Sequence, residues 1–338
     1  MAGTIATTGS PQSTRLLMWT LLVIYVFNFL DRQIVNILAH DISRDLNLSD
    51  TQIGLMTGLA FAVFYTFLGI PIARYADRPH TNRARLITLS LGLWSLMTAA
   101  CGMAQNFVQL LLARIGVGVG EAGCTPAAHS IITDAVPKEK RASAIAFYGM
   151  GIPIGSLIGM AVGGALADAI GWRNTFLAVS IPGILFAFVL PFILKDPGRH
   201  ASDHPGGPQQ PFLEALVQIM SSRAFVLVLL GASSTAFLSY GKGVWVTILF
   251  QRDFGLSAAE TGFWLGITGG LSSMLGTWLG GYFADKYGAV DRRHILTGPA
   301  LGMVLAAPIL FAAYYVEDWR WAVALLMLPG LLNYLYYG

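Results

Sequence analysis

Charged residues are scarce in this chain, and cysteine is almost absent. Asp, Glu, Lys and Arg make up 12% of the sequence, about half the share found in ordinary soluble domains. The two cysteines, Cys101 and Cys124, both fall in apolar segments, so a disulfide framework is excluded and we interpret them as packing residues. Residues 1–14 are polar and lack the layout of a signal peptide, which favours a short cytoplasmic tail.

Apolar residues dominate instead, at 55% of the chain with a mean hydropathy of +0.61. They form long runs, and each run reaches the roughly 20 residues that a helix needs to cross a bilayer. The runs do not alternate as barrel strands would. The sequence therefore predicts an all-α polytopic membrane protein with about ten helices, near 16–38, 51–75, 84–104, 107–132, 142–168, 173–194, 223–250, 260–284, 295–315 and 320–338.

Basic residues predict the orientation. With the N-terminus in the cytoplasm, 14 Lys and Arg residues fall in cytoplasmic segments, four (Arg44, Arg173, Arg252 and Arg320) fall outside, and three lie within spans. This bias follows the positive-inside rule, so we expect an integral protein of a bacterial inner (plasma) membrane. The net charge of +3 then reports topology, and no nucleic-acid partner is inferred from it.

The chain contains an internal repeat with an offset of 208 positions. Leu48-Ser49, Gly54, Gly58 and Ala76-Asp77-Arg78 recur as Leu256-Ser257, Gly262, Gly266 and Ala284-Asp285-Lys286. Ser49 with Gln52, and Ser257 with Glu260, have the spacing of helix capping boxes. Membrane proteins built from two similar halves usually bind their cargo between the halves and rock around it. A transporter is therefore the leading hypothesis.

The repeat divides the chain into a tail (1–15), a six-helix bundle (16–195), a cytoplasmic linker with an interfacial helix (196–222) and a second bundle (223–338). The Pro- and Gly-rich stretch after Lys195 suits a flexible connector. If the first half ends near Leu194, the matching end of the second half lies near 402, about 64 residues past Gly338. We expect twelve helices in the native protein and a fragment here; a genuine ten-span protein is the alternative.

Two loops resemble a known signature. Residues 73–85 and 281–293 are similar to the loop of the major facilitator superfamily, in which a glycine precedes an aspartate–basic pair and a second glycine. The first copy departs from the pattern at Ala73 and after Arg78. The resemblance implies two pseudo-symmetric six-helix bundles, the second truncated here, and a gating role for Asp77, Arg78, Asp285 and Lys286. It implies that Asp77 braces the eleventh span; simple topology-setting charge is the alternative.

Spans 1 and 4 carry a narrower resemblance. Arg114 followed by Gly118 resembles the fourth-span motif of the superfamily. Glu121 after the glycine run, together with Asn28-Phe29-Leu30-Asp31-Arg32, resembles the spinster-like transporters. That resemblance implies proton-coupled carriage of lysophospholipids or sphingoid phosphates by alternating access, with small organic anions or drugs as the alternative cargo.

The intramembrane charges support the same hypothesis on physical grounds. Arg114 and Glu121 are seven residues apart and share a helix face, and Arg114 and Asp31 lie about equally deep. Ionisable groups at such depth almost always face partners or a wet cavity. We expect Glu121 first and Asp31 second to carry the proton, with Arg32 and Arg114 as charge partners. A static ion-pair network is the alternative.

Span 7 carries one further cation, Lys242, which lies at nearly the depth of Asp31. Facing a central cavity, it would hold an anionic head group, with Tyr240 and Trp245 against the rest of the cargo. Snorkelling to the membrane surface is the alternative. His129 is interpreted as a packing residue.

Span 5 has a stripe of small residues: Gly151, Gly155, Gly159 and Gly163. Such stripes let helix backbones approach closely. Because the resemblance places spans 5 and 8 face to face across the halves, we expect this stripe to form a sliding contact with span 8.

Catalysis is not expected. Glu121, Cys124 and His129 lack metal-ligand spacing or a nucleophile motif, and no cofactor or metal is inferred. An intramembrane enzyme and a non-transporting sensor remain the alternatives of another class. The expected partners are a small-molecule or lipid substrate, protons and membrane lipids, with the protein itself a monomer.

Overall fold

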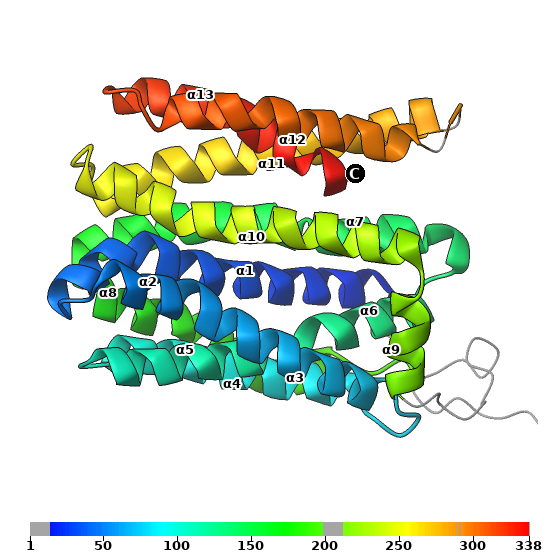
Figure 1. Cartoon of the computed structure of the whole chain (residues 1–338). Helices are drawn as coiled ribbons and strands as arrows, with labels where there is room; N and C mark the ends of the chain where they lie inside the picture. The colour runs from blue at the N-terminus through cyan, green and yellow to red at the C-terminus, as the bar shows by residue number, and fades with distance from the viewer. Residues whose placement is uncertain (1–13, 199–211, 289, 292, 338) are drawn as a thin grey trace, which may run out of the picture.

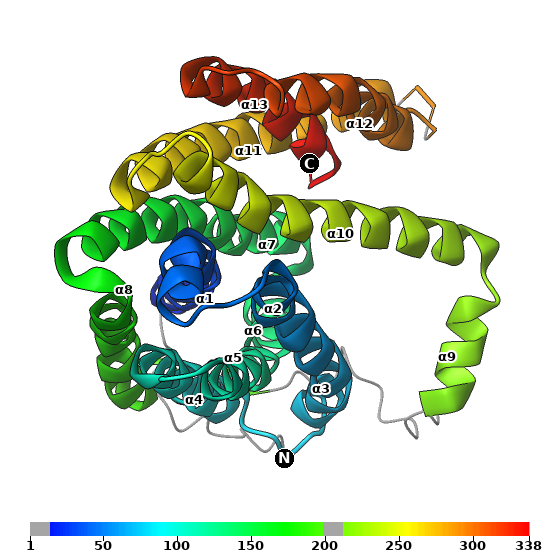
Figure 2. The ribbon, with the colours of Figure 1, turned by 60° about the vertical axis from the view of Figure 1, so that its left-hand side comes forward.

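The computed structural model describes residues 14–198, 212–288, 290–291 and 293–337. Every regular element in these ranges is helical. Most of the expected tail (1–15) and the central part of the linker lie outside the described residues. The helices run roughly along one direction and form a bundle, with α1 near its centre (Figures 1 and 2).

The first half of the chain folds around α1 (Thr14–Asp45), which is apolar on most of its surface. It comprises, in addition, α2 (Asp50–Gly54), the π-helical turn η1 (Leu55–Leu59), α3 (Ala60–Ala76), α4 (Arg83–Met103), α5 (Phe107–Glu121), α6 (Cys124–Ala135), the short 3₁₀ helix η2 (Lys138–Lys140), α7 (Arg141–Gly149) and α8 (Gly151–Ile193). One continuous core of buried apolar side chains, including Ile34, Ile37, Trp94 and Phe176, joins these helices.

The second half begins with α9 (Phe212–Met220) and α10 (Arg223–Arg252), followed by α11 (Ala258–Gly288), α12 (His294–Ala313), α13 (Trp319–Tyr334) and the 3₁₀ turn η3 (Leu335–Tyr337). Helix α9 lies beside the bundle, and helices α11–α13 cover one side of α10 (Figure 2). A helix was expected over these linker residues; its interfacial placement stays a prediction.

The ten expected spans all fall on helices. Runs 51–75 and 107–132 cover two or more elements each, and α8 joins runs five and six across a break at Gly171, whose φ of +78° is accessible to glycine at low cost. Among the described residues, seven helical segments are long and apolar enough to cross a membrane. Both predicted capping boxes are confirmed, at Ser49 with Gln52 and at Ser257 with Glu260.

The glycine stripe of span 5 packs differently from the prediction. A Cβ at Gly155 would lie 2.5 Å from the Val26 carbonyl oxygen of α1, and one at Gly159 would lie 2.8 Å from the Leu30 carbonyl oxygen. Gly151 and Gly163 also face α1. The stripe therefore joins spans 5 and 1 within the first half, and the expectation that it slides on span 8 is wrong.

The two halves nevertheless meet through spans 5 and 8, as expected. The neighbouring face of α8 contacts α11, where the backbone of Gly262 approaches the Met160 carbonyl oxygen so closely that a side chain would not fit. Gly164 of α8 likewise lies directly against the Ala258 backbone. Close approach without side chains is the packing mode that membrane helices use to associate.

Candidate functional site

Arg32 is the centre of the candidate site. It lies on α1, whose apolar flanks bury it in the bundle, and its Nε atom donates to Glu121 Oε2 of α5 at 2.7 Å. The Arg32 side chain is 10% exposed and the Glu121 side chain is fully buried. Such a pair is costly to desolvate and is strongly disfavoured once either partner is lost. The charge on Glu121 is therefore tied to the position of Arg32.

Aromatic rings surround the same guanidinium. The Cζ atom of Arg32 lies 4.9 Å from the ring centroids of Phe29 and Phe61 and 4.8 Å from that of Tyr65. Arginine over aromatic faces gains cation–π attraction, which grows as water is excluded. The rings thus hold the cation in place beside its carboxylate partner.

Arg32 also touches the second half of the chain. Its Nη1 atom donates to the Tyr240 hydroxyl of α10 at 3.0 Å. The two residues are 208 positions apart, which is the offset of the internal repeat, so they occupy equivalent positions in the two halves. A contact between equivalent positions lies near the pseudo-two-fold axis that relates such halves. Arg32 therefore connects Glu121 to the opposite half at that axis.

Asp31 and Arg114 complete the cluster. Asp31 is 5% exposed and Arg114 2% exposed, and Asp31 experiences the charges of both Glu121 and Arg114. The Arg114 guanidinium lies 5.5 Å from the Phe61 ring centroid, on the same ring that faces Arg32. The structure thus brings together all four charges that the sequence singled out.

One oxygen in this cluster has no partner. Among the buried side-chain atoms of the described residues, Glu121 Oε1 accepts no hydrogen bond, although Oε2 is bonded to Arg32. The Asn28 amide group lies close to this carboxyl group, but the two do not form a hydrogen bond of standard geometry. An oxygen without a hydrogen-bond donor is the atom of this carboxyl group at which a proton would bind.

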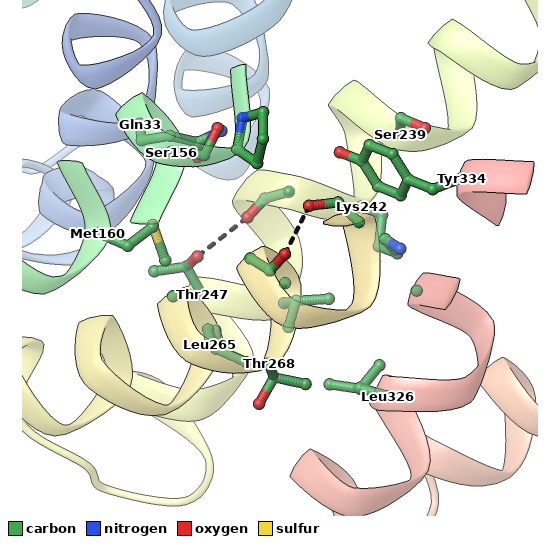
Figure 3. Close-up of a pocket in the computed structure, with 18 of the residues that line it drawn as sticks. Gln33, Ser156, Met160, Ser239, Lys242, Thr247, Leu265, Thr268, Leu326 and Tyr334 are labelled. Carbon is green, nitrogen blue, oxygen red and sulfur yellow. Dashed lines mark hydrogen bonds between the residues drawn. The ribbon is translucent and has the colours of Figure 1, made fainter. Parts of the chain in front are cut away.

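Two cavities lie on different faces of α10. One, of about 550 Å³, is mostly apolar and is lined by Arg32, Tyr240 and Trp245 together with residues of η1 and α3. The other, of about 190 Å³, contains Lys242 and lies among α1, α8, α10, α11 and α13 (Figure 3). The three residues expected to share one substrate site are therefore divided: Tyr240 and Trp245 border the first cavity, and Lys242 borders the second.

The ends of the bundle differ in their polar contacts between halves. We call the end that contains connections 46–49, 104–106 and 253–257 the short-loop end, and the end that contains 77–82, 194–198 and 221–222 the linker end; they are at left and right in Figure 1. At the short-loop end Arg252 Nη2 lies 3.0 Å from Asp50 Oδ1, and Gln251 Nε2 donates to the Ile37 carbonyl oxygen at 3.0 Å.

Asp168 adds a third contact at the short-loop end. Its carboxylate, on α8, accepts the backbone N–H groups of Ala258 at 3.2 Å and Ala259 at 2.9 Å. These N–H groups begin α11 and have no partner within that helix, so a carboxylate stabilises them through both hydrogen bonding and the helix dipole. Sequence reasoning missed Asp168, and the predicted capping box at Ser257 was the signal that a helix starts opposite it.

The predicted gating residues lie at the linker end. Asp77 is exposed at the C-terminus of α3, and Arg78 lies 5.7 Å from the Tyr75 ring centroid. Lys286 of α11 lies 5.5 Å from the ring centroids of Tyr282 and Tyr287, and Asp285 is exposed. Within the described residues, the structure does not bring the two copies of the motif into contact.

Arg83 organises the linker end within the first half, and sequence reasoning missed it. Fully buried, it makes an ion pair with Asp134, donates from Nη2 to Asp196 Oδ1 at 2.6 Å and from Nη1 to Ser130 at 3.0 Å. Burial raises the pKa of Asp196, but the hydrogen bonds from Arg83 outweigh it and hold that pKa below its usual value. The basic run after Asp77 was the available signal, because an arginine there can reach neighbouring helix ends.

Comparison with known proteins agrees with this architecture. The family model described as Major Facilitator Superfamily matches residues 21–337. An MFS-type efflux pump of Mycolicibacterium smegmatis is 31% identical over 300 residues, which cover 88% of this chain and 68% of the pump. The hexuronate transporter of Bacillus subtilis is 30% identical over 184 residues, 53% of this chain and 42% of that protein.

Solved structures extend the likeness to three dimensions. The crystal structure of a bacterial homolog to the human lysosomal transporter spinster, in an inward-facing and unoccupied conformation, superposes with a TM-score of 0.84 at 34% identity, covering 98% of this chain and 74% of that one. Its occupied inward-facing form gives a TM-score of 0.83. With the charge cluster on spans 1 and 4 and the matched halves, these findings show that the chain is a spinster-like member of the major facilitator superfamily of membrane transporters.

Proposed function

We propose that this protein is a proton-coupled secondary transporter that moves an amphiphilic, anionic substrate of the lysolipid or sphingoid type by alternating access. The observation that carries the proposal is the position of Arg32, which bonds Glu121 in the first half and Tyr240 in the second. A single side chain thereby links a protonatable carboxyl to the relative position of the two halves.

The coupling follows from charge balance. While Glu121 is ionised, Arg32 is neutralised and held against α5. Protonation of Glu121 removes the attraction and leaves a buried cation without its counter-charge, which is unfavourable by several kcal/mol unless the cation finds another partner. That imbalance favours a rearrangement of the two halves, because Arg32 is bonded to both of them. Asp31 and Arg114 are the second carboxyl and its charge partner in this scheme.

The cavities provide for the two parts of such a substrate. The larger, apolar cavity, with Tyr240 and Trp245 on its wall, suits a hydrocarbon chain, because its lining gains from excluding water. Lys242 faces the smaller cavity, where it remains our candidate for the anionic group. A small organic anion is the second candidate substrate, favoured by the polar lining of the Lys242 cavity and by the likeness to a hexuronate transporter.

Orientation and gating belong to the same proposal. The basic residues of the connections at the linker end support a cytoplasmic location for that end, in a protein of a bacterial inner membrane with its N-terminus inside. Asp77, Arg78, Asp285 and Lys286 would then act at the cytoplasmic side, in the alternate state in which that side closes. The units that would move are the two bundles (16–195 and 223–338), together with the tail (1–15) and the linker (196–222). The protein would act as a monomer.

The test is substrate uptake into proteoliposomes driven by a pH gradient. Glu121→Gln keeps the size and hydrogen-bonding capacity of the side chain but cannot titrate, so gradient-driven uptake should vanish while substrate binding remains. Glu139→Gln, the same change at an exposed residue of η2, is the matched control. Full gradient-driven uptake in Glu121→Gln would rule out Glu121 as the proton carrier and favour a static network. Failure of the wild type to move any substrate would favour a sensor or an intramembrane enzyme.

A further inference from the structure

The cavity around Lys242 differs chemically from the apolar cavity on the other face of α10. Besides Lys242, its polar lining consists of hydroxyl and amide side chains, including Gln33, Ser156, Ser239 and Asn333, and it contains no Asp or Glu. Figure 3 shows Gln33 and Ser156 on one side and Ser239, Tyr334 and Lys242 on the other. Residues from both halves of the chain therefore meet around one cation.

Lys242 has no partner of its own. Within the described parts of the chain, its ammonium group makes no ion pair and no hydrogen bond, although the side chain is largely enclosed. An ammonium group offers three hydrogen-bond donors and no acceptor, and leaving such a group unpaired in an enclosed site is costly. An anion that enters the site from outside the protein therefore explains why this position holds a lysine and not a neutral residue.

The hydroxyl groups of the lining restrict the chemical class of the ligand further. Thr247, Thr268 and Ser273 donate their hydroxyl protons to backbone carbonyl oxygens of their own helices, at 2.9, 2.6 and 2.9 Å. Their oxygen lone pairs are left to accept hydrogen bonds from a ligand. The amide groups of Gln33 and Asn333 can both donate and accept. This lining complements a ligand with several hydroxyl groups as well as one negative charge.

The size of the cavity limits the size of the group that can bind in it. Its volume of about 190 Å³ lies below the roughly 300–1,000 Å³ typical of sites for drug-sized ligands, so a long hydrocarbon chain does not fit inside it. We propose that the Lys242 cavity is a binding site for a compact polyhydroxylated group that carries a single carboxylate or phosphate. This group is either a free sugar acid or the polyol head group of a lysolipid. The inference rests on the proposed transport function and assigns the polar part of its substrate.

The experiment measures binding to the purified protein by calorimetry, with two anionic probes and their controls. D-glucuronate represents the free sugar acid and D-glucose its neutral counterpart; lysophosphatidylglycerol represents the polyol head group, and lysophosphatidylcholine lacks both the net charge and the head-group hydroxyls. We expect at least one anionic probe to bind more tightly than its control. Glucuronate binding identifies the free acid, and binding of only the lysolipid identifies the head group.

Variants of the cavity decide where the probe binds. Lys242→Met should weaken binding of the anionic probe about tenfold or more, the size expected for loss of a charge-assisted hydrogen bond. Ser239→Ala should weaken it about threefold, because one neutral hydrogen bond is lost. Lys140→Met, the same substitution at an exposed site on η2, is the matched control and should bind normally. Since Lys242 is unpaired, Lys242→Met should also melt no lower than the wild type.

The inference is overturned if neither anionic probe is preferred, if Lys242→Met binds as the wild type does, or if it binds more weakly only because it has lost thermal stability. Proton-driven uptake of a substrate in Lys242→Met, measured in parallel, separates this failure from failure of the proposed function. A transporter that works without Lys242 contradicts the site assignment alone. A wild-type protein that binds a probe at Lys242 but transports nothing contradicts the transport proposal alone.

Discussion

The short-loop end and the linker end of the bundle are stabilised in different ways. At the short-loop end, the polar contacts run between the halves: Arg252 with Asp50, Gln251 with Ile37, and Asp168 with the start of α11. At the linker end, the buried ion pairs of Arg83 lie within the first half. Among the described residues, these three polar contacts between the bundles lie at the short-loop end, and the chain is similar to relatives solved in inward-facing conformations.

This difference distinguishes residues that stabilise one bundle from residues that stabilise one conformation of the two bundles. Contacts within a half persist while the halves rock, so their loss lowers stability in every conformation. Contacts between halves exist in only one conformation, so their loss shifts the population of that conformation by their own differential free energy. Arg32 makes contacts of both classes, because it is bonded to Glu121 within the first half and to Tyr240 in the second.

The largest effect is expected at the linker end. Arg83→Met leaves Asp134 and Asp196 buried without their cation, which should lower the free energy of unfolding by about 3–5 kcal/mol. The loss should leave the equilibrium between the two facing states unchanged, because none of the three residues lies in the second bundle (223–338). Thermal unfolding in detergent and inter-half distances from spin labels measure the two quantities.

The same ion pairs predict a pH dependence. Because the pKa of Asp196 is lowered in the folded protein, its contribution is complete above the unfolded value of about 3.9 and is lost as the pH falls through the folded value. Arg83→Met should remove this acid-dependent part of the unfolding curve. An unchanged curve, or a large shift between facing states in that variant, would show that Arg83 does not act as a connection internal to the first half.

A smaller effect is expected from filling the contact between α8 and α11. In Gly262→Ala, the added methyl group would collide with the Met160 carbonyl oxygen, so the short-loop end should open at a cost of about 1–3 kcal/mol to the closed state. Spin labels in connections 46–49 and 253–257 would report a longer distance. Gly298→Ala is the matched control, since a Cβ there has no neighbour within 4 Å. Equal distances in both variants would mean that this contact does not hold the end closed.

The smallest effect is expected from Asp168→Asn. The amide can still accept one of the two backbone hydrogen bonds but loses the charge that complements the helix dipole, so the closed state should lose about 1 kcal/mol. The same spin-label distances should shift toward the open state, by less than in Gly262→Ala. Glu317→Gln, a neutralising change at an exposed residue outside this contact, should leave them unchanged. An Asp168→Asn variant indistinguishable from that control would remove Asp168 from the closure.

Much of this arrangement could be predicted from the sequence because helix periodicity and repeat spacing constrain it. A separation of seven positions places Arg114 and Glu121 on one face of a helix, and the repeat located the capping boxes at Ser49 and Ser257. The contact of Arg32 with Tyr240 was not predicted, although the offset of 208 relates the two residues, because a sequence repeat does not reveal which equivalent positions lie on the axis.

The remaining differences depend on how neighbouring helices are rotated. Lys242 is two residues from Tyr240, and a rotation of about 100° per residue turns it to nearly the opposite side of α10, toward another cavity. The glycine stripe of span 5 could have faced either span 1 or span 8, and tertiary packing selected span 1. Arg83 was overlooked because its partners, Asp134 and Asp196, lie 51 and 113 residues away.

The most direct measurement of the central claim is infrared difference spectroscopy of the reconstituted protein during a change of pH. A carboxyl group that binds a proton gives a distinct C=O stretching band, separate from that of the ionised form. We predict a titrating band that disappears in Glu121→Gln and persists in Glu139→Gln, together with a change of the Arg32 guanidinium signal. A spectrum that is the same in Glu121→Gln and in the wild type would contradict proton binding at the junction of the two halves.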